Sequence, residues 1–332
     1  MTSLAMKDQR LPMLRGLRPP TSLWITLAIF VVFALCVPRF ATLGNLENLL
    51  RVAAILGIAA CGQAIVLILG GIEFSFGASA ALASVLIVLS EPFVGTPAAF
   101  AVGAGSCLAV GAINGLLVAR FDLAPFLVTL GMLMVCGGLA ASIAGGLPID
   151  APASSVFSWP ARGRILGISV PVVAALLSFV LLYAILSHTH LGRLWYLCGS
   201  NPVAARLAGL PVRQVLFSGY LAASGFCALA ALILTSRVAS GQPNLAPNLP
   251  FETIAACAIG GIPLAGGQGR ASQVACGVFV IAMMNNAVVL TNLPVAWQYV
   301  LIATVIVGAV LLQRAGPVLT DFLAIVRGRS GR

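Results

Sequence analysis

Long apolar runs separated by short polar connections make up most of this 332-residue chain. Most runs reach about 18–22 residues, the length that a helix needs to cross the ~30 Å hydrocarbon core of a bilayer. Membrane β-strands would show alternating segments of about ten residues instead. The pattern predicts an all-α polytopic membrane protein. About ten membrane elements are expected, near 21–37, 49–69, 77–90, 97–119, 125–145, 168–187, 214–236, 252–266, 273–291 and 295–313.

Two of these elements, 77–90 and 252–266, are short for a full crossing, and each adjoins a glycine cluster. Broken or partial helices are expected there. A weak two-fold internal repeat accompanies them, and transporters often carry such repeats with glycine-interrupted helices in matching places. Unequal spacing between the copies leaves chance similarity as an alternative. The repeat is carried by Ile-Ala-Ala-Cys at 58–61 and 254–257, Gly-Gly-Ile at 70–72 and 260–262, and Asn114 opposite Asn285.

Composition excludes a soluble domain, because 60% of the residues are hydrophobic, only 8% are charged and the mean hydropathy is +1.08. The formal charge of +10 comes from basic residues scattered between the apolar runs, which favours the positive-inside rule over nucleic-acid binding. With both termini cytoplasmic, 13 Lys and Arg lie inside and 5 outside. The expected organisation is an N-terminal tail 1–20 that precedes an uncleaved first helix, a transmembrane domain 21–313 and a C-terminal tail 314–332.

Enzymatic chemistry has little support in the chain. There is no phosphate-binding loop, H-E-x-x-H or G-x-S-x-G motif, so no catalytic residue and no ATP hydrolysis by this polypeptide are expected. His188 and His190 lack further ligands nearby, and the eight cysteines form no C-x-x-C pair, so no metal site or bound cofactor is predicted. The cysteines are interpreted as small apolar packing residues.

Glu73 and Ser75 lie in a glycine-bounded break, 70–77, within an apolar stretch. A carboxylate at membrane depth costs several kcal/mol unless it is solvated or paired. Two interpretations stay open: the pair lines a hydrophilic pathway, or it caps the next helix at an interface. Thr129 in the fifth element has the same ambiguity, since its hydroxyl could face a pore or bond back to the preceding turn.

The cytoplasmic loop 188–213 contains the polar, alanine-rich stretch 199–209. Asn201 is a good N-cap and Pro202 suits the first helical position, which predicts a helix over 202–208 that stops at Gly209. A helix this short needs a neighbour, either lipid headgroups or a groove in another protein. Membrane-surface helices prefer bulky apolar residues, so the alanines favour a protein partner.

Five stretches in order resemble the permease subunit of bacterial ABC importers for sugars, the ribose/xylose/galactose-type family, and they span residues ~45–312. Glu73 stands where that family usually has Asp, and Arg270-Ala271-Ser272 stand where it commonly has Gly-Thr. The stretches are GGIEFSFG (70–77), NGLLV (114–118), PFLVTLG (125–131), GSNPVAARLAGL (199–210) and IAACAIGGIPLAGGQG (254–269).

The resemblance implies a multi-pass protein of the bacterial inner membrane that pairs with a second copy or a paralogue. A periplasmic binding protein would deliver a sugar or related solute, and a separate cytoplasmic ATPase would bind ATP and magnesium. An ion-coupled secondary transporter is the alternative, disfavoured by the scarcity of intramembrane acids. Implied coupling residues are Gly199, Ser200, Asn201, Pro202, Ala204, Ala205, Arg206 and Gly209. Pathway candidates are Glu73, Ser75, Asn114, Phe126, Thr129 and Asn285.

Overall fold

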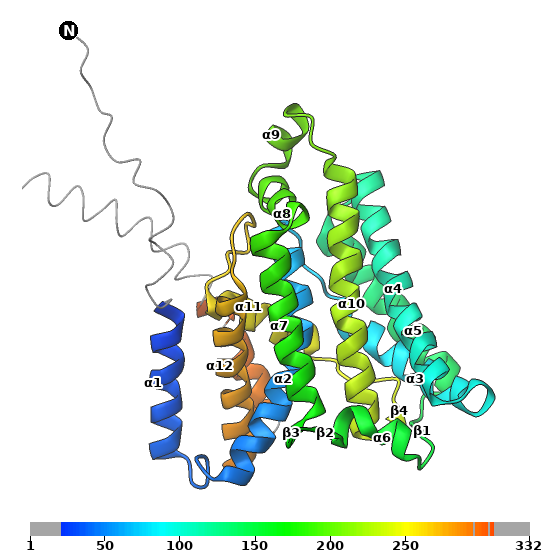
Figure 1. Ribbon diagram of the computed structural model, residues 1–332, viewed down its shortest axis with the longest axis vertical. Coiled ribbons are helices and arrows are strands. Elements are labelled where there is room, and N and C mark those ends of the chain that lie inside the picture. Colours follow the sequence, from blue (N-terminus) through cyan, green and yellow to red (C-terminus); the bar gives the residue numbers. More distant parts are fainter. Residues whose placement is uncertain (1–20, 295, 305, 309–332) are drawn as a thin grey trace, which may run out of the picture.

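Apolar helices running up and down a single bundle dominate the computed structural model, which describes residues 21–294, 296–304 and 306–308 (Figure 1). Among these residues, seven helices are long and apolar enough to cross a membrane. They are α2 (Leu43–Ile68), α3 (Phe76–Val94), α4 (Thr96–Phe121), α5 (Pro125–Ala144), α7 (Val170–His188), α10 (Val212–Val238) and α12 (Ala271–Leu290). Three shorter apolar helices are α1 (Thr21–Cys36), α11 (Leu249–Gly260) and Ala296–Gly308.

These helices confirm the all-α class and the ten predicted elements. The third element is longer than predicted, because α3 has 19 residues and continues past Pro92. The eighth is short as expected: α11 has 12 residues and ends where Gly261 takes a left-handed conformation (φ 97°). The predicted tails 1–20 and 314–332 lie outside the described residues.

Several small elements connect the long helices, and of these only α9 (Pro202–Leu207) was predicted. The helix α8 (His190–Ser200) precedes it in the expected loop 188–213. At the opposite end lie α6 (Ser155–Arg162) and four two-residue strands. These are β1 (Ile149–Asp150) antiparallel to β4 (Ser240–Gly241), and β2 (Arg164–Ile165) antiparallel to β3 (Ile168–Ser169). Short amphipathic or two-residue elements carry too few apolar positions to stand out in a hydropathy pattern.

Two central helices, α2 and α10, pack against each other, and each also packs against helices from the other half of the chain. Helices α3 and α4 pack on α10, whereas α11 and α12 pack on α2. In this arrangement α2, α3 and α4 correspond to α10, α11 and α12, so Asn114 on α4 and Asn285 on α12 occupy matching helices. The Ile-Ala-Ala-Cys copies do not, since 58–61 is in α2 and 254–257 is in α11. They meet directly instead, where Cys257 Sγ donates to the Ala60 carbonyl (3.6 Å).

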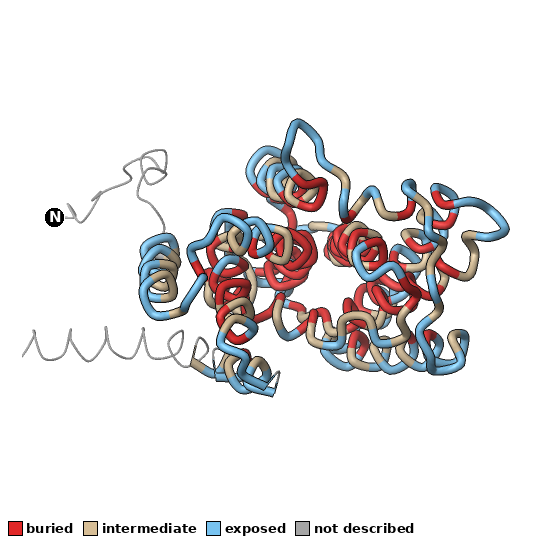
Figure 2. Tube along the Cα trace, turned by 90° about the horizontal axis from the view of Figure 1, so that it is seen from below, coloured by how far each residue is buried: buried red, intermediate tan, exposed pale blue. Residues whose placement is uncertain are grey.

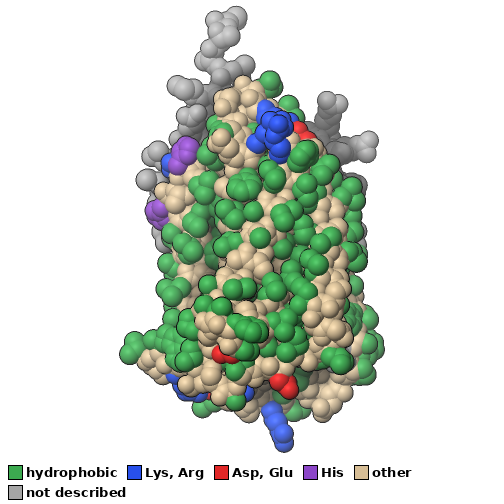
Figure 3. Space-filling view, turned by 90° about the vertical axis from the view of Figure 1, so that its right-hand side faces the viewer, with side chains coloured by type: hydrophobic (Ala, Val, Ile, Leu, Met, Phe, Trp, Pro, Cys, Tyr) green, Lys and Arg blue, Asp and Glu red, His purple; other side chains and the backbone are tan. Residues whose placement is uncertain are grey.

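Buried residues concentrate around the central helices, with exposed residues on the outer helices (Figure 2). On the face in Figure 3, charged side chains gather at the two ends and leave an apolar band between them, as a bilayer requires. Five described arginines lie at the α9 end (120, 193, 206, 213 and 270) and five at the α6 end (39, 51, 162, 164 and 237). The predicted split of 13 to 5 therefore depends on the eight basic residues of the two tails, outside the described part.

Candidate functional site

Helix α9 projects from one end of the bundle, with α8 beneath it (Figure 1). The predicted capping is confirmed: Asn201 Oδ1 accepts a hydrogen bond from Ala204 N (2.9 Å), and Pro202 is the first residue of α9. The helix ends at Leu207, and Gly209 follows with φ 76°. Local chemistry alone therefore sets both ends of α9.

Helix α8 is held against the bundle, whereas α9 protrudes. Leu194, Trp195 and Cys198 form the buried face of α8, and Trp195 is fully buried. The Trp195 indole Nε1 donates to Ser218 Oγ on α10 (3.1 Å). A force applied to α9 therefore reaches the membrane helices through a helix that is already packed on them.

The exposed side of α9 carries two apolar residues that the sequence reasoning did not single out. Val203 is 66% exposed and Leu207 is 86% exposed. They stand four residues apart, so they lie on one face of the helix. Of the alanines expected to meet a partner, Ala204 is exposed and Ala205 is buried. The i, i+4 spacing of Val203 and Leu207 was the signal available in the sequence.

Three chain segments meet backbone to backbone beneath α9. Gly199, at the end of α8, is buried, and a Cβ there would overlap the Ile68 carbonyl oxygen at the end of α2. Gly267 N donates to that same oxygen (2.8 Å). A Cβ on Gly266 would lie only 2.8 Å from the backbone of Gly70. This glycine junction, formed by Ile68, Gly70, Gly199, Gly266 and Gly267, joins the end of α8 to both glycine-rich breaks.

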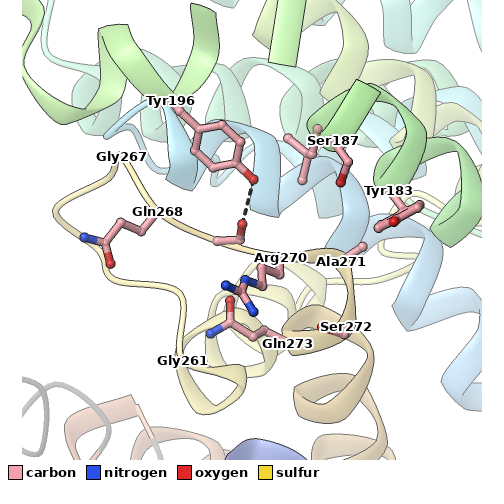
Figure 4. Close-up of a pocket in the computed structure, with 12 residues that line it drawn as sticks. Tyr183, Ser187, Tyr196, Gly261, Gly267, Gln268, Arg270, Ala271, Ser272 and Gln273 are labelled. Carbon is pink, nitrogen blue, oxygen red and sulfur yellow. Dashed lines mark hydrogen bonds between the residues drawn. The ribbon is translucent and has the colours of Figure 1, made fainter. Parts of the chain in front are cut away.

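Figure 4 shows a cavity of about 790 Å³ beside the glycine junction, lined by residues of α7, α8, the 261–270 loop and the start of α12. Tyr196 Oη donates to the Gly269 carbonyl (2.6 Å) across it. Burial raises the pKa of the Tyr196 phenol, with Arg270 opposing the shift, so the hydroxyl stays protonated as the donor. This bond is a second tie between α8 and the second glycine-rich segment.

Arg206, one of the implied coupling residues, forms an ion pair within the chain. Its Nη2 lies 2.6 Å from Asp122 Oδ1 in the link between α4 and α5, and both side chains are about half exposed. Asp122 itself holds a left-handed conformation (φ 54°) at the end of α4. The pair connects α9 to the membrane helices by a route separate from α8.

Reversing Arg206 is expected to impair coupling without unfolding the protein. Arg206→Glu places two carboxylates together, whereas the double variant Arg206→Glu with Asp122→Arg restores opposite charges. An exposed pair contributes less than about 1 kcal/mol to stability, so thermal stability should barely change. ATP-driven uptake should fall in the single variant and recover in the double one. Failure of the double variant to recover would show that Arg206 acts outside this pair.

The first group of pathway candidates forms a buried hydrogen-bonded cluster. Glu73, Ser75 and Asn114 are each 2% exposed or less. Glu73 Oε1 accepts from Ser75 N (2.7 Å) and Ser75 Oγ (2.5 Å), and Glu73 Oε2 accepts from Asn114 Nδ2 (3.2 Å). The Gln63 amide, turned so that both atoms are satisfied, pairs with the Glu73 backbone N–H and C=O. Glu73 therefore accepts hydrogen bonds from Ser75, the residue that precedes α3. Its carboxylate lies inside the core, neither at an interface nor on an open surface.

The remaining candidates lie elsewhere. Thr129 Oγ1 donates mainly to the Ile72 carbonyl (3.0 Å), with a longer contact to the preceding turn at Phe126 O (3.5 Å), so its main bond matches neither interpretation. Phe126 is 47% exposed. Asn285 Nδ2 donates to Glu252 Oε1 (3.0 Å), which places a glutamate–asparagine pair in the second half where the first half has Glu73 and Asn114.

The described residues contain no group of three or more His, Cys, Asp or Glu side chains that could hold a metal ion. The eight cysteines are free thiols, and all but Cys36 are buried.

The fold defines the class: a helical protein with several helices long and apolar enough to cross a membrane. Residues 45–310 match the family described as "Branched-chain amino acid transport system / permease component". The match covers most of the chain, and this chain belongs to that family of permeases.

Among similar proteins, a ribose import permease of Bacillus subtilis is 36% identical over 288 residues, covering 86% of this chain and 89% of that protein. The ribose import permease of Escherichia coli K12 is 31% identical, covering 88% and 92%. An L-arabinose ABC transporter permease of Azospirillum brasilense is 31% identical, covering 87% and 86%. No solved structure matches the chain.

Proposed function

We propose that this chain forms the transmembrane pathway of an ATP-binding-cassette importer for a sugar or sugar-like solute. The observation that carries the proposal is the α8–α9 segment, whose exposed Val203 and Leu207 provide an apolar surface while α8 stays fixed to the bundle. Relatives that cover nearly the full length are ribose and L-arabinose permeases, which supports a sugar rather than the amino acids in the family's description.

The partners follow from this role. A cytoplasmic ATPase subunit that binds ATP and magnesium docks on α9, with Asn201, Pro202, Ala204 and Leu207 facing it. Ser200 and Gly209 flank this surface, whereas the buried Gly199 and Ala205 support it by packing. A second permease copy or a paralogue completes the pathway, and a periplasmic binding protein approaches the α6 end. This orientation puts both termini in the cytoplasm of a bacterial cell, with the chain in the inner membrane.

The test is reconstitution of the permease with its ATPase and binding protein in proteoliposomes. Uptake of radiolabelled ribose or arabinose should require ATP and should continue when an uncoupler dissipates the proton gradient. Leu207→Glu should lower both uptake and co-purification of the ATPase at least about tenfold, because a charge would be buried in an apolar contact. The matched variant Leu166→Glu, 98% exposed at the opposite end, should retain the ATPase. Uptake by the permease alone, abolished by an uncoupler, would establish the ion-coupled alternative.

A further inference from the structure

An irregular segment, residues 242–248, runs alongside α3 between the two ends of the helix bundle. Ser84 Oγ accepts a hydrogen bond from Gln242 N (3.2 Å) at one end of the segment. At the other end, a Cβ on Gly77 would overlap the Ala246 carbonyl oxygen. Ser84 and Gly77 both belong to the candidate membrane span α3. The segment therefore extends along about two turns of a membrane helix without being helical itself.

Backbone of this kind cannot face lipid. Without water, each unpaired N–H or C=O costs several kcal/mol, so non-helical chain at membrane depth is tolerated only against protein or beside a water-filled cavity. Asn244 is exposed and Asn248 is partly exposed. Among the described residues, neither side-chain amide has a hydrogen-bond partner. The exposed side of 242–248 is thus suited to water or to a polar solute.

Three aromatic rings border the segment at the start of α11. Phe74 contacts Phe126 (ring centroids 5.4 Å apart) and Phe251 (5.8 Å). Phe126 and Phe251 are 47% and 44% exposed. Phe251 follows Asn248 by three residues, within the first turn of α11, so the amide and the ring lie on neighbouring positions of one surface. The rings come from the first glycine-rich break, from α5 and from α11, so both halves of the chain contribute to the cluster.

We infer that Asn244, Asn248, Phe126 and Phe251 form a solute-contacting surface of the pathway, which takes a neutral polyhydroxylated solute. This inference rests on the proposed function and deepens it. Amides both donate and accept hydrogen bonds, as hydroxyl groups require, and aromatic rings cover the apolar C–H faces of a sugar. A zwitterionic amino acid would need a cation for its carboxylate, whereas the described arginines lie at the two ends of the bundle. The surface therefore favours sugars within a family described by amino acid transport.

Cysteine accessibility in the assembled transporter tests this surface without measuring transport. In a Cys36→Ser background, the other seven native thiols are buried. Asn244→Cys and Asn248→Cys should react with a charged, membrane-impermeant thiosulfonate at least about tenfold faster than Leu177→Cys, which is 64% exposed on α7 at the apolar periphery. Labelling no faster than at Leu177→Cys would overturn the inference, since the residues would then lie in lipid or between tightly packed subunits.

A second variant pair tests the aromatic part in proteoliposomes with D-ribose and L-arabinose as probes. Phe251→Ala should lower uptake of the transported sugar about fivefold, while Phe251→Tyr, which keeps the ring, should stay near the wild-type rate. ATPase co-purification should be unchanged in both. Wild-type uptake with Phe251→Ala would overturn the role of the ring. Failure of the wild-type protein to show ATP-dependent uptake would instead count against the proposed function, leaving the labelling result intact.

Discussion

Gly199→Ala is expected to lower ATP-driven uptake more than about tenfold, although Ala has the highest helix propensity. The obstacle is space, because the added Cβ would overlap the Ile68 carbonyl oxygen and lie 3.1 Å from Gly267 N. All of these neighbours are backbone atoms, which cannot rotate away as a side chain can. Overpacking of this kind costs about 1–3 kcal/mol, and relief requires α8 to separate from the ends of α2 and the second glycine-rich segment.

The measurement compares uptake, ATP hydrolysis and ATPase co-purification for Gly199→Ala and Gly105→Ala. Gly105 lies in α4 with no atom within 4 Å of an added Cβ, so its variant should behave like wild type. We expect Gly199→Ala to keep the ATPase bound through α9 but to hydrolyse ATP without transport. Normal coupling in this variant would mean that the glycine junction plays no part in transmitting motion.

Glu73→Ala is expected to cause the largest loss of stability among single carboxylate changes. Removing the buried carboxylate leaves Ser75 N and Ser75 Oγ without their acceptor and leaves Asn114 Nδ2 with only Ser75 Oγ. Each unsatisfied buried donor costs about 1–3 kcal/mol, so the free energy of unfolding should fall by about 3 kcal/mol or more. The Asn114 Oδ1 and Tyr220 Oη atoms lack hydrogen-bond partners among the described residues, so the cluster is not fully hydrogen-bonded even with the carboxylate in place.

Thermal unfolding in detergent checks this expectation, with Glu47→Ala as the matched control. Glu47 is 47% exposed and paired with Arg51 and Arg164 at the α6 end, so its loss should cost under about 1 kcal/mol. Glu73→Gln, which keeps one acceptor oxygen, should be intermediate. Equal stability of Glu73→Ala and Glu47→Ala would contradict a structural role for the Glu73 cluster.

Much of the architecture could be predicted from local properties of the sequence. Apolar run length identified the membrane helices, since the bilayer sets a minimum length that is readable along the chain. The capping of α9 was predictable because Asn201 and the Ala204 N–H that donates to it lie three residues apart. The short α11 was predictable because glycines end helices. The motif pattern across residues ~45–312 was enough to identify the permease family that residues 45–310 match.

Relations between distant segments needed the tertiary structure. Sequence alone placed Glu73 on a possible pathway, but its burial depends on Asn114, 41 residues away. The closeness of Gly199 to Ile68, the pairing of Arg206 with Asp122 and the exposure of Asn244 and Asn248 likewise arise from helix packing. Periodicity and capping act over a few residues and are therefore written locally, whereas which face of a helix meets another chain segment is decided only when remote segments pack together.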